Sequence, residues 1–172
     1  EGGGTAEVVT FLCEPDQVAT GRIFRPRAEG DSTGPKLGAF KVRGAHLVRD
    51  DFVEREIEAE RLDGGGRSRV TVRVANVLPY TVLKIFAFQD RHENKDAYDL
   101  IFTLLNHEDG PRAAGAASAE SPIADNEQVE EALALLAGRF AAADTAGPSA
   151  AALFLARHVP AEGRARPEGR PS

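Results

Sequence analysis

The chain has 172 residues, a net charge of −6 and 28% charged residues, which suits one compact domain. No stretch approaches the ~20 uninterrupted apolar residues of a membrane-spanning helix. The single cysteine, Cys13, excludes a disulfide framework and a cysteine-based zinc site. These features favour a cytoplasmic protein that meets nucleic acid only through a local basic patch, if at all.

The sequence contains no methionine, and Glu1–Thr5 has neither the basic nor the apolar region of a signal peptide. We therefore expect Glu1 to follow a processed or missing N-terminal segment. The chain carries 17 arginines and 4 lysines, which suggests a GC-rich genome. Lysine and arginine are not chemically interchangeable, so the few retained lysines, among them Lys84 and Lys95, are candidates for a specific role.

The N-terminal part is predicted to be strand-rich. Residues 7–12 form a short β-rich run that ends at the turn signal of residues 14–16, and residues 25–36 read as a Pro- and Gly-containing loop. Residues 52–62 alternate between glutamates and a mixed set of Val, Arg, Ile and Ala, which predicts a strand with one acidic, solvated face. Glycines 64–66 link this strand to the alternating valines of residues 69–75, so a β-hairpin is predicted over residues 52–76.

The pattern changes to a helical period near Pro79. The first predicted helix ends near residues 89–92 and buries an apolar stripe (Val82, Leu83, Ile85, Phe86 and Phe88). Asn94 is expected to cap a second helix, whose predicted buried face is Ala97, Leu100, Ile101, Leu104 and Leu105. A third helix is predicted over residues 126–142, burying Val129, Leu133, Leu136 and Phe140, and a fourth from Pro148.

These elements predict an α+β fold, with a small, mainly antiparallel sheet packed against a helical C-terminal half. The predicted organisation has four parts. Residues 1–108 hold the strands and the first two helices, and residues 109–125, rich in Ala, Gly, Ser and Pro, form a linker. Residues 126–158 form the C-terminal helical part, and residues 159–172 form a disordered tail.

The densest group of chemically useful side chains lies between Lys84 and Asp99. Lys84 and Arg91 are seven residues apart and lie on one side of the first helix. Asp96 and Asp99 are three apart on the second helix and share a face. A tight corner between the two helices brings these cations and carboxylates together, so that an ammonium could neutralise triphosphate charge while carboxylates hold Mg²⁺ or orient the lysine.

A purely structural interpretation competes with this one. Asp96 stands in the first turn of its helix, where the helix dipole favours an anion, and Lys95 and Asp99 form an i,i+4 pair. The same charges can therefore serve only as a helix cap and as surface ion pairs. The histidines at 46, 92, 107 and 158 show no metal-ligand spacing and are expected to be structural or exposed.

The segment from Leu78 to Leu100 also resembles a known family. Its Lys84, Arg91, Lys95-Asp96-x-x-Asp99-Leu100 pattern is similar to the later motifs of AbiEii-type nucleotidyltransferases, which belong to the DNA polymerase β-like superfamily and include type IV toxin–antitoxin toxins. The preceding hairpin and the helical C-terminal third are compatible with that fold.

The resemblance implies Mg²⁺-dependent transfer of a nucleotide from an NTP to an acceptor, often RNA. It implies catalytic roles for Lys84, Asp96 and Asp99, nucleotide contacts from Lys84, Arg91 and Lys95, and a cognate antitoxin as partner. The family's Asp-x-Asp, which holds the catalytic metal, is absent from this sequence, and residues 2–5 do not replace its Gly-Ser loop. Glu7 is the carboxylate that the early strand offers.

Three hypotheses follow from the sequence. The first is a nucleotidyltransferase-like protein seen without its first catalytic motifs. The second is a non-catalytic descendant of that fold that binds a nucleotide or a partner protein. The third is an interaction domain in which the charged residues between Lys84 and Asp99 only cap the helices and form surface ion pairs.

Overall fold

The computed structural model describes residues 11–14, 19, 22–24, 38–61 and 64–158. Within them, the N-terminal part forms small sheets and the C-terminal half forms five α-helices, so the predicted α+β fold is confirmed. The predicted strand over 7–12 is seen as β1, Phe11–Cys13. Residues 7–10, the whole loop predicted at 25–36 and the tail at 159–172 lie outside the described residues.

The strands form two separate sheets. In the first, β3 (Ala39–Lys41) lies between β1, to which it is parallel, and β2 (Ile23–Phe24), to which it is antiparallel. The second is the antiparallel hairpin of β4 (Phe52–Glu60) and β5 (Arg67–Ala75), in the predicted position. A 3₁₀-helix, η1 (Ala45–Arg49), connects the two sheets.

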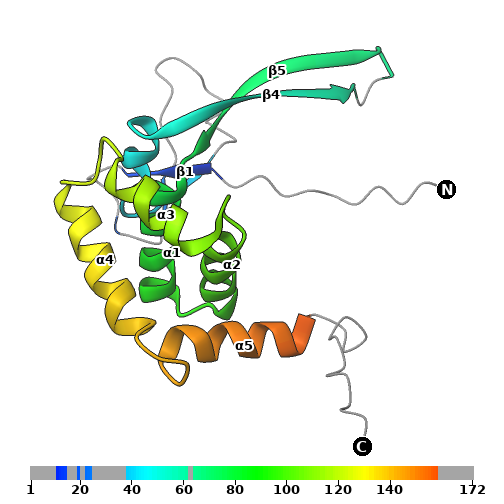
Figure 1. Ribbon diagram of the computed structural model, residues 1–172. Coiled ribbons are helices and arrows are strands. Elements are labelled where there is room, and N and C mark those ends of the chain that lie inside the picture. The colour runs from blue at the N-terminus through cyan, green and yellow to red at the C-terminus, as the bar shows by residue number, and fades with distance from the viewer. Residues whose placement is uncertain (1–10, 15–18, 20–21, 25–37, 62–63, 159–172) are drawn as a thin grey trace, which may run out of the picture.

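The hairpin projects away from the helices, and most of it is exposed on both faces (Figure 1). Its register places Glu54, Glu56 and Glu58 opposite Arg73, Thr71 and Arg69 on the predicted solvated face. The other face is also open, since Ile57, Val70 and Val74 are each about half exposed. Alternation therefore predicted the strands correctly, although no layer of the described residues covers the less polar face.

The core forms around α1 (Val77–Arg91), which packs against α2 (Asn94–Leu105), α3 (Gly110–Ala119) and α4 (Glu127–Arg139). Helix α5 (Ala146–His158) packs on α2 and lies across the end of the helices opposite the hairpin (Figure 1). Four residues of the predicted α1 stripe are fully or almost fully buried: Val82, Ile85, Phe86 and Phe88. Among the described residues, no helix combines the length and apolarity needed to cross a lipid bilayer.

Several helix predictions are corrected. The linker predicted over 109–125 contains α3, because its alanines favour helix and Pro111 suits the first turn. The N-cap of α2 is Glu93, so Asn94 is its first residue and Asp96 stands one position later than predicted. Two side chains predicted to be buried are substantially exposed, because no described element packs over them: Leu105 (61% exposed) and Leu133 (42%).

Candidate functional site

A two-residue corner positions the candidate site. Helix α1 ends at Arg91, and its C-cap residue, His92, adopts the left-handed conformation with φ of 55° and donates its backbone N–H to the Phe88 carbonyl. Glu93 then caps α2, and its carbonyl accepts from the N–H of Asp96. Because the connection is so short, the last turns of α1 lie beside the first turns of α2.

The five residues that the sequence singled out meet at this corner. Lys84 Nζ lies 2.7 Å from Asp99 Oδ2 and 3.2 Å from Asp96 Oδ1. Arg91 Nη2 donates to both oxygens of Asp96, at 2.9 and 2.7 Å, and Lys95 Nζ lies 2.6 Å from Asp99 Oδ2. We call Lys84, Arg91, Lys95, Asp96 and Asp99 the Lys84 cluster.

The cluster has its carboxylates inside and two of its cations outside. The side chains of Asp96 and Asp99 are 3% and 16% exposed, whereas those of Arg91 and Lys95 are about 60% exposed. Lys84 lies between these extremes at 22%. Since a buried carboxylate is stable only when it is paired, the two aspartates fix the positions of the three cations.

The burial and the pairing act in opposite directions on protonation. Burial lowers the pKa of Lys84, but its hydrogen bond to Asp99 and the charges of Asp99 and Asp96 outweigh burial, so the pKa is raised above its ordinary value. Burial raises the pKa of Asp99, and the hydrogen bonds from Lys84 and Lys95 outweigh it, so that pKa is lowered. Both residues are therefore charged at neutral pH.

The cations keep donors that the aspartates do not use. Arg91 contacts Asp96 through Nη2 alone, which leaves the N–H groups of Nη1 and Nε without a partner among the described residues. Lys84 and Lys95 each retain at least one N–H, and Lys84 Nζ lies 5.9 Å from the centre of the Tyr80 ring. Three cations against two carboxylates give the cluster a net charge of +1.

The described residues alone do not form a site for a resident Mg²⁺ ion. Within the described part of the chain, no three His, Cys, Asp or Glu side chains lie close enough together to hold a metal. In Asp96 both oxygens accept hydrogen bonds from cations, and Asp99 Oδ2 accepts two, so these aspartates act as anchors for cations. Glu7 and residues 2–5 lie outside the described residues.

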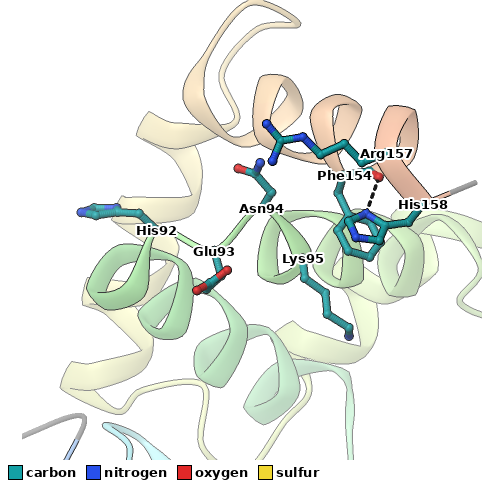
Figure 2. Close-up of a pocket in the computed structure, with 7 residues that line it drawn as sticks. All are labelled: His92, Glu93, Asn94, Lys95, Phe154, Arg157 and His158. Atoms are coloured by element: carbon teal, nitrogen blue, oxygen red, sulfur yellow. Dashed lines mark hydrogen bonds between the residues drawn. The ribbon is translucent and has the colours of Figure 1, made fainter.

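A hollow of about 340 Å³ adjoins the cluster at Lys95 (Figure 2). It is lined by the helix corner and the end of α5, through His92, Glu93, Asn94, Lys95, Phe154, Arg157 and His158. In Figure 2 the side chains of Arg157 and Asn94 point toward each other, and Lys95 points away from them. The rings of Phe154 and His158 stack with centres 4.4 Å apart, and His158 Nδ1 lies 3.0 Å from the Phe154 carbonyl oxygen.

Sequence reasoning missed a second polar group, which centres on Glu14. Its carboxylate accepts hydrogen bonds from the backbone N–H groups of Gly44 and His46 and from the Gln128 side chain, and it lies 2.6 Å from His46 Nδ1. Burial raises the Glu14 pKa, but these hydrogen bonds, that of His46 first, outweigh burial and lower it. Through these contacts Glu14 connects the end of β1 to η1 and α4. This confirms a structural role for His46.

Two further polar residues, Arg43 and Asp51, make contacts that the sequence did not predict. Arg43 pairs with Glu131, 88 residues away, and stacks its guanidinium 4.1 Å from the centre of the Phe86 ring. Asp51, which is buried, accepts from Asn76 and from Ser121. Neither the spacing nor the residue types at these positions distinguish them from ordinary surface residues.

Comparisons of the chain with models of protein families, with curated proteins and with solved structures give no match.

Proposed function

We propose that this chain is a nucleotidyltransferase-like protein and that its Lys84 cluster binds the triphosphate of an NTP. The observation that carries the proposal is the convergence of Lys84, Arg91 and Lys95 on two largely buried aspartates. The resemblance to AbiEii-type nucleotidyltransferases, which rests on the same residues, supports the same conclusion.

The arrangement suits a polyanion because the cations are held in place before the ligand arrives. A lysine or arginine side chain otherwise loses about 2 kcal/mol of rotamer entropy when it is fixed. In the cluster, Asp96 and Asp99 already restrain the three side chains, so less of this entropy is lost on binding. Lys84, Arg91 and Lys95 would contact phosphate oxygens, and the aspartates are positioning residues.

The hollow beside Lys95 offers room for the remainder of the nucleotide. Phe154 packs between Tyr98 and His158, so the exposed His158 ring offers its outer face to a nucleobase, and such stacking contributes about 1–3 kcal/mol. Arg157 makes no hydrogen bond or ion pair with a described residue through its side chain, so its guanidinium is a further donor for a ribose or phosphate oxygen.

The reaction that such a site serves is attack of an acceptor oxygen on the α-phosphorus of the NTP. A new P–O bond forms to the acceptor, often an RNA hydroxyl in the family that the chain resembles, and pyrophosphate leaves. The described residues supply cations for the triphosphate and no cluster of metal-binding carboxylates. The cation contacts therefore support NTP binding by the described residues. Nucleotide transfer and a cognate antitoxin as partner form the wider proposal, which rests on the resemblance.

Titration calorimetry with NTP tests the proposal directly. Wild-type protein is expected to bind an NTP, and Lys84→Met is expected to weaken binding about 10–100-fold, because a hydrogen bond to a charged group contributes about 1.5–3 kcal/mol. Lys41→Met is the matched control, since Lys41 stands on β3 and has no side-chain contact with the cluster. Equal affinities for wild type and Lys84→Met, or no binding by either, would show that the Lys84 cluster is only a set of structural ion pairs between α1 and α2.

A labelling experiment separates binding from transfer. Incubation of the wild-type protein with NTP labelled at the α-phosphorus, Mg²⁺ and total RNA measures label incorporated into RNA or into the protein itself. Incorporation that Lys84→Met abolishes supports a transferase. NTP binding without incorporation supports the non-catalytic descendant of the fold.

A further inference from the structure

A groove of about 440 Å³ lies between α1, α3 and α4, and none of its lining residues belongs to the Lys84 cluster. Its walls are apolar or small side chains, including Leu78, Leu104, Ala114, Val129, Leu133 and Leu136. No charged side chain lines it, and the hydroxyl of Ser118, also in the lining, donates to the Ala114 carbonyl at 2.8 Å. A groove of this volume and lining lies within the range of sites that hold small organic ligands, about 300–1,000 Å³.

The composition of α3 accounts for the space. Between Gly110 and Ala119, eight of ten residues are Gly, Ala or Ser, so the helix presents little side-chain volume to α1 and α4. At Gly115 an added Cβ would meet nothing within 4 Å. Leu133, on the opposite wall, stays 42% exposed because no larger side chain of α3 reaches it.

Thr81 provides the second observation. It lines the groove from the interior of α1, is 4% exposed, and its Oγ1 is buried without a hydrogen-bond partner. An unpaired buried hydroxyl costs about 1–3 kcal/mol, whereas valine would fill nearly the same volume without that cost. Threonine in a helix has two accessible χ1 rotamers, so rotation about χ1 would turn the buried Thr81 hydroxyl toward a ligand in the groove.

We propose that this groove binds a small, uncharged and mainly apolar molecule whose one polar group, a hydroxyl or a carbonyl, pairs with the Thr81 hydroxyl. The absence of charge among the lining residues excludes ionic ligands, since a buried charge here would have no partner. The Thr81 hydroxyl, which can both donate and accept, selects a ligand with one polar group over a hydrocarbon of the same shape. The proposal does not depend on NTP binding at the Lys84 cluster.

The test uses a pair of probes that differ only in a hydroxyl, 4-ethylphenol and ethylbenzene. Amide chemical shifts of the full chain are followed during titration with each probe. Both are expected to bind in the groove, with the phenol tighter by about fivefold, as expected for one neutral hydrogen bond. Thr81→Val is expected to remove this preference while leaving the affinity for ethylbenzene unchanged.

Two glycine variants supply a blocking test and its control. Gly115→Leu places a side chain in the groove and also raises helix propensity, so it is expected to fold and to lose both probes. Gly138→Leu makes the same change on α4, at a glycine that also has nothing within 4 Å of an added Cβ but does not line the groove. It is expected to bind both probes as wild type does.

Three results would overturn the proposal. These are wild-type protein that binds neither probe, probe binding that Gly115→Leu leaves unchanged, and equal affinities for the two probes in the wild type. A rise in the melting temperature of Thr81→Val with its phenol preference intact would show that the hydroxyl has no role in recognition.

Discussion

Asp96 is the residue on which the Lys84 cluster most depends. Its carboxylate is 3% exposed and accepts hydrogen bonds from Lys84 and, through both oxygens, from Arg91. An aspartate that served only the helix dipole would contribute about 0.5–1 kcal/mol. The burial and the paired contacts show that Asp96 does more than favour the first turn of α2.

Asp96→Asn is accordingly expected to lower the free energy of unfolding by about 2–3 kcal/mol, because charge-assisted hydrogen bonds from two cations are lost at a buried position. Urea denaturation of the two proteins measures the difference. Asp90→Asn is the matched control, because Asp90 is exposed on α1 and forms no ion pair with a described residue, and it should change stability by less than about 0.5 kcal/mol. A loss below about 1 kcal/mol for Asp96→Asn would support the dipole role alone.

At the level of elements, the junction between α4 and α5 depends on one glycine. Gly147, in the first turn of α5, is buried against the Phe140 ring, and a Cβ added there would overlap that ring. Phe140 itself packs on Phe88 of α1, with ring centres 6.0 Å apart. A side chain at position 147 would therefore displace the Phe140 ring and disturb its packing on Phe88 of α1.

Gly147→Ala is expected to destabilise the protein by about 1–3 kcal/mol through overpacking, although alanine favours helix. Gly138→Ala, where an added Cβ meets nothing, should instead stabilise it by about 0.5–1 kcal/mol. Thermal unfolding should show a lower melting temperature for Gly147→Ala and a higher one for Gly138→Ala. Equal effects of the two substitutions would contradict the packing described for Gly147.

The hairpin shows how far the sequence predicts an element. Alternation over residues 52–62 and 69–75 is a local property, and it predicted β4 (Phe52–Glu60) and β5 (Arg67–Ala75). Whether a layer covers the face of Ile57, Val70 and Val74 depends on other parts of the chain, and the pattern contains no information on that. The ion pairs on the opposite face, such as Arg73 with Glu54, are exposed and each contribute about 0–1 kcal/mol.

The same distinction applies to the site. The Lys84 cluster was predictable because its members lie within 16 residues and their spacing on two helices fixes which of them share a face. The Glu14 group was not, because Glu14 and Gln128 are 114 residues apart and only the fold brings them together. The helix in the predicted linker was missed for another reason, since Gly, Ser and Pro outweighed alanine in the interpretation of residues 109–125.

For the whole molecule, the cluster and the Glu14 group make stability depend on pH. The pKa values of Asp99 and Glu14 are lowered on folding from ordinary values of 3.8 and 4.5, so the folded state binds fewer protons than the unfolded state in acid. Their stabilisation is complete above these ordinary values and is lost as the pH falls through the lowered ones. The pKa of Lys84 is raised, so its contribution is lost at alkaline pH, above 10.5.

The free energy of unfolding is therefore expected to fall steadily between about pH 5 and pH 2. Asp99→Asn should reduce the slope of that fall, because one carboxylate with a lowered pKa has been removed. Urea denaturation at a series of pH values measures both slopes. An unchanged slope in Asp99→Asn would show that its ion pairs with Lys84 and Lys95 add nothing to the acid dependence.

The central claim is that the Lys84 cluster is a binding site for a triphosphate, and amide chemical-shift mapping tests it most directly. Titration of the wild-type chain with ATP should shift the amides of residues 84–99, and inorganic tripolyphosphate should shift the same residues because it carries the same anionic group. ATP should also shift residues 154–158 at the hollow, whereas tripolyphosphate should not. Shifts confined to other parts of the molecule, or none with either ligand, would contradict the claim and leave the cluster as a set of structural ion pairs.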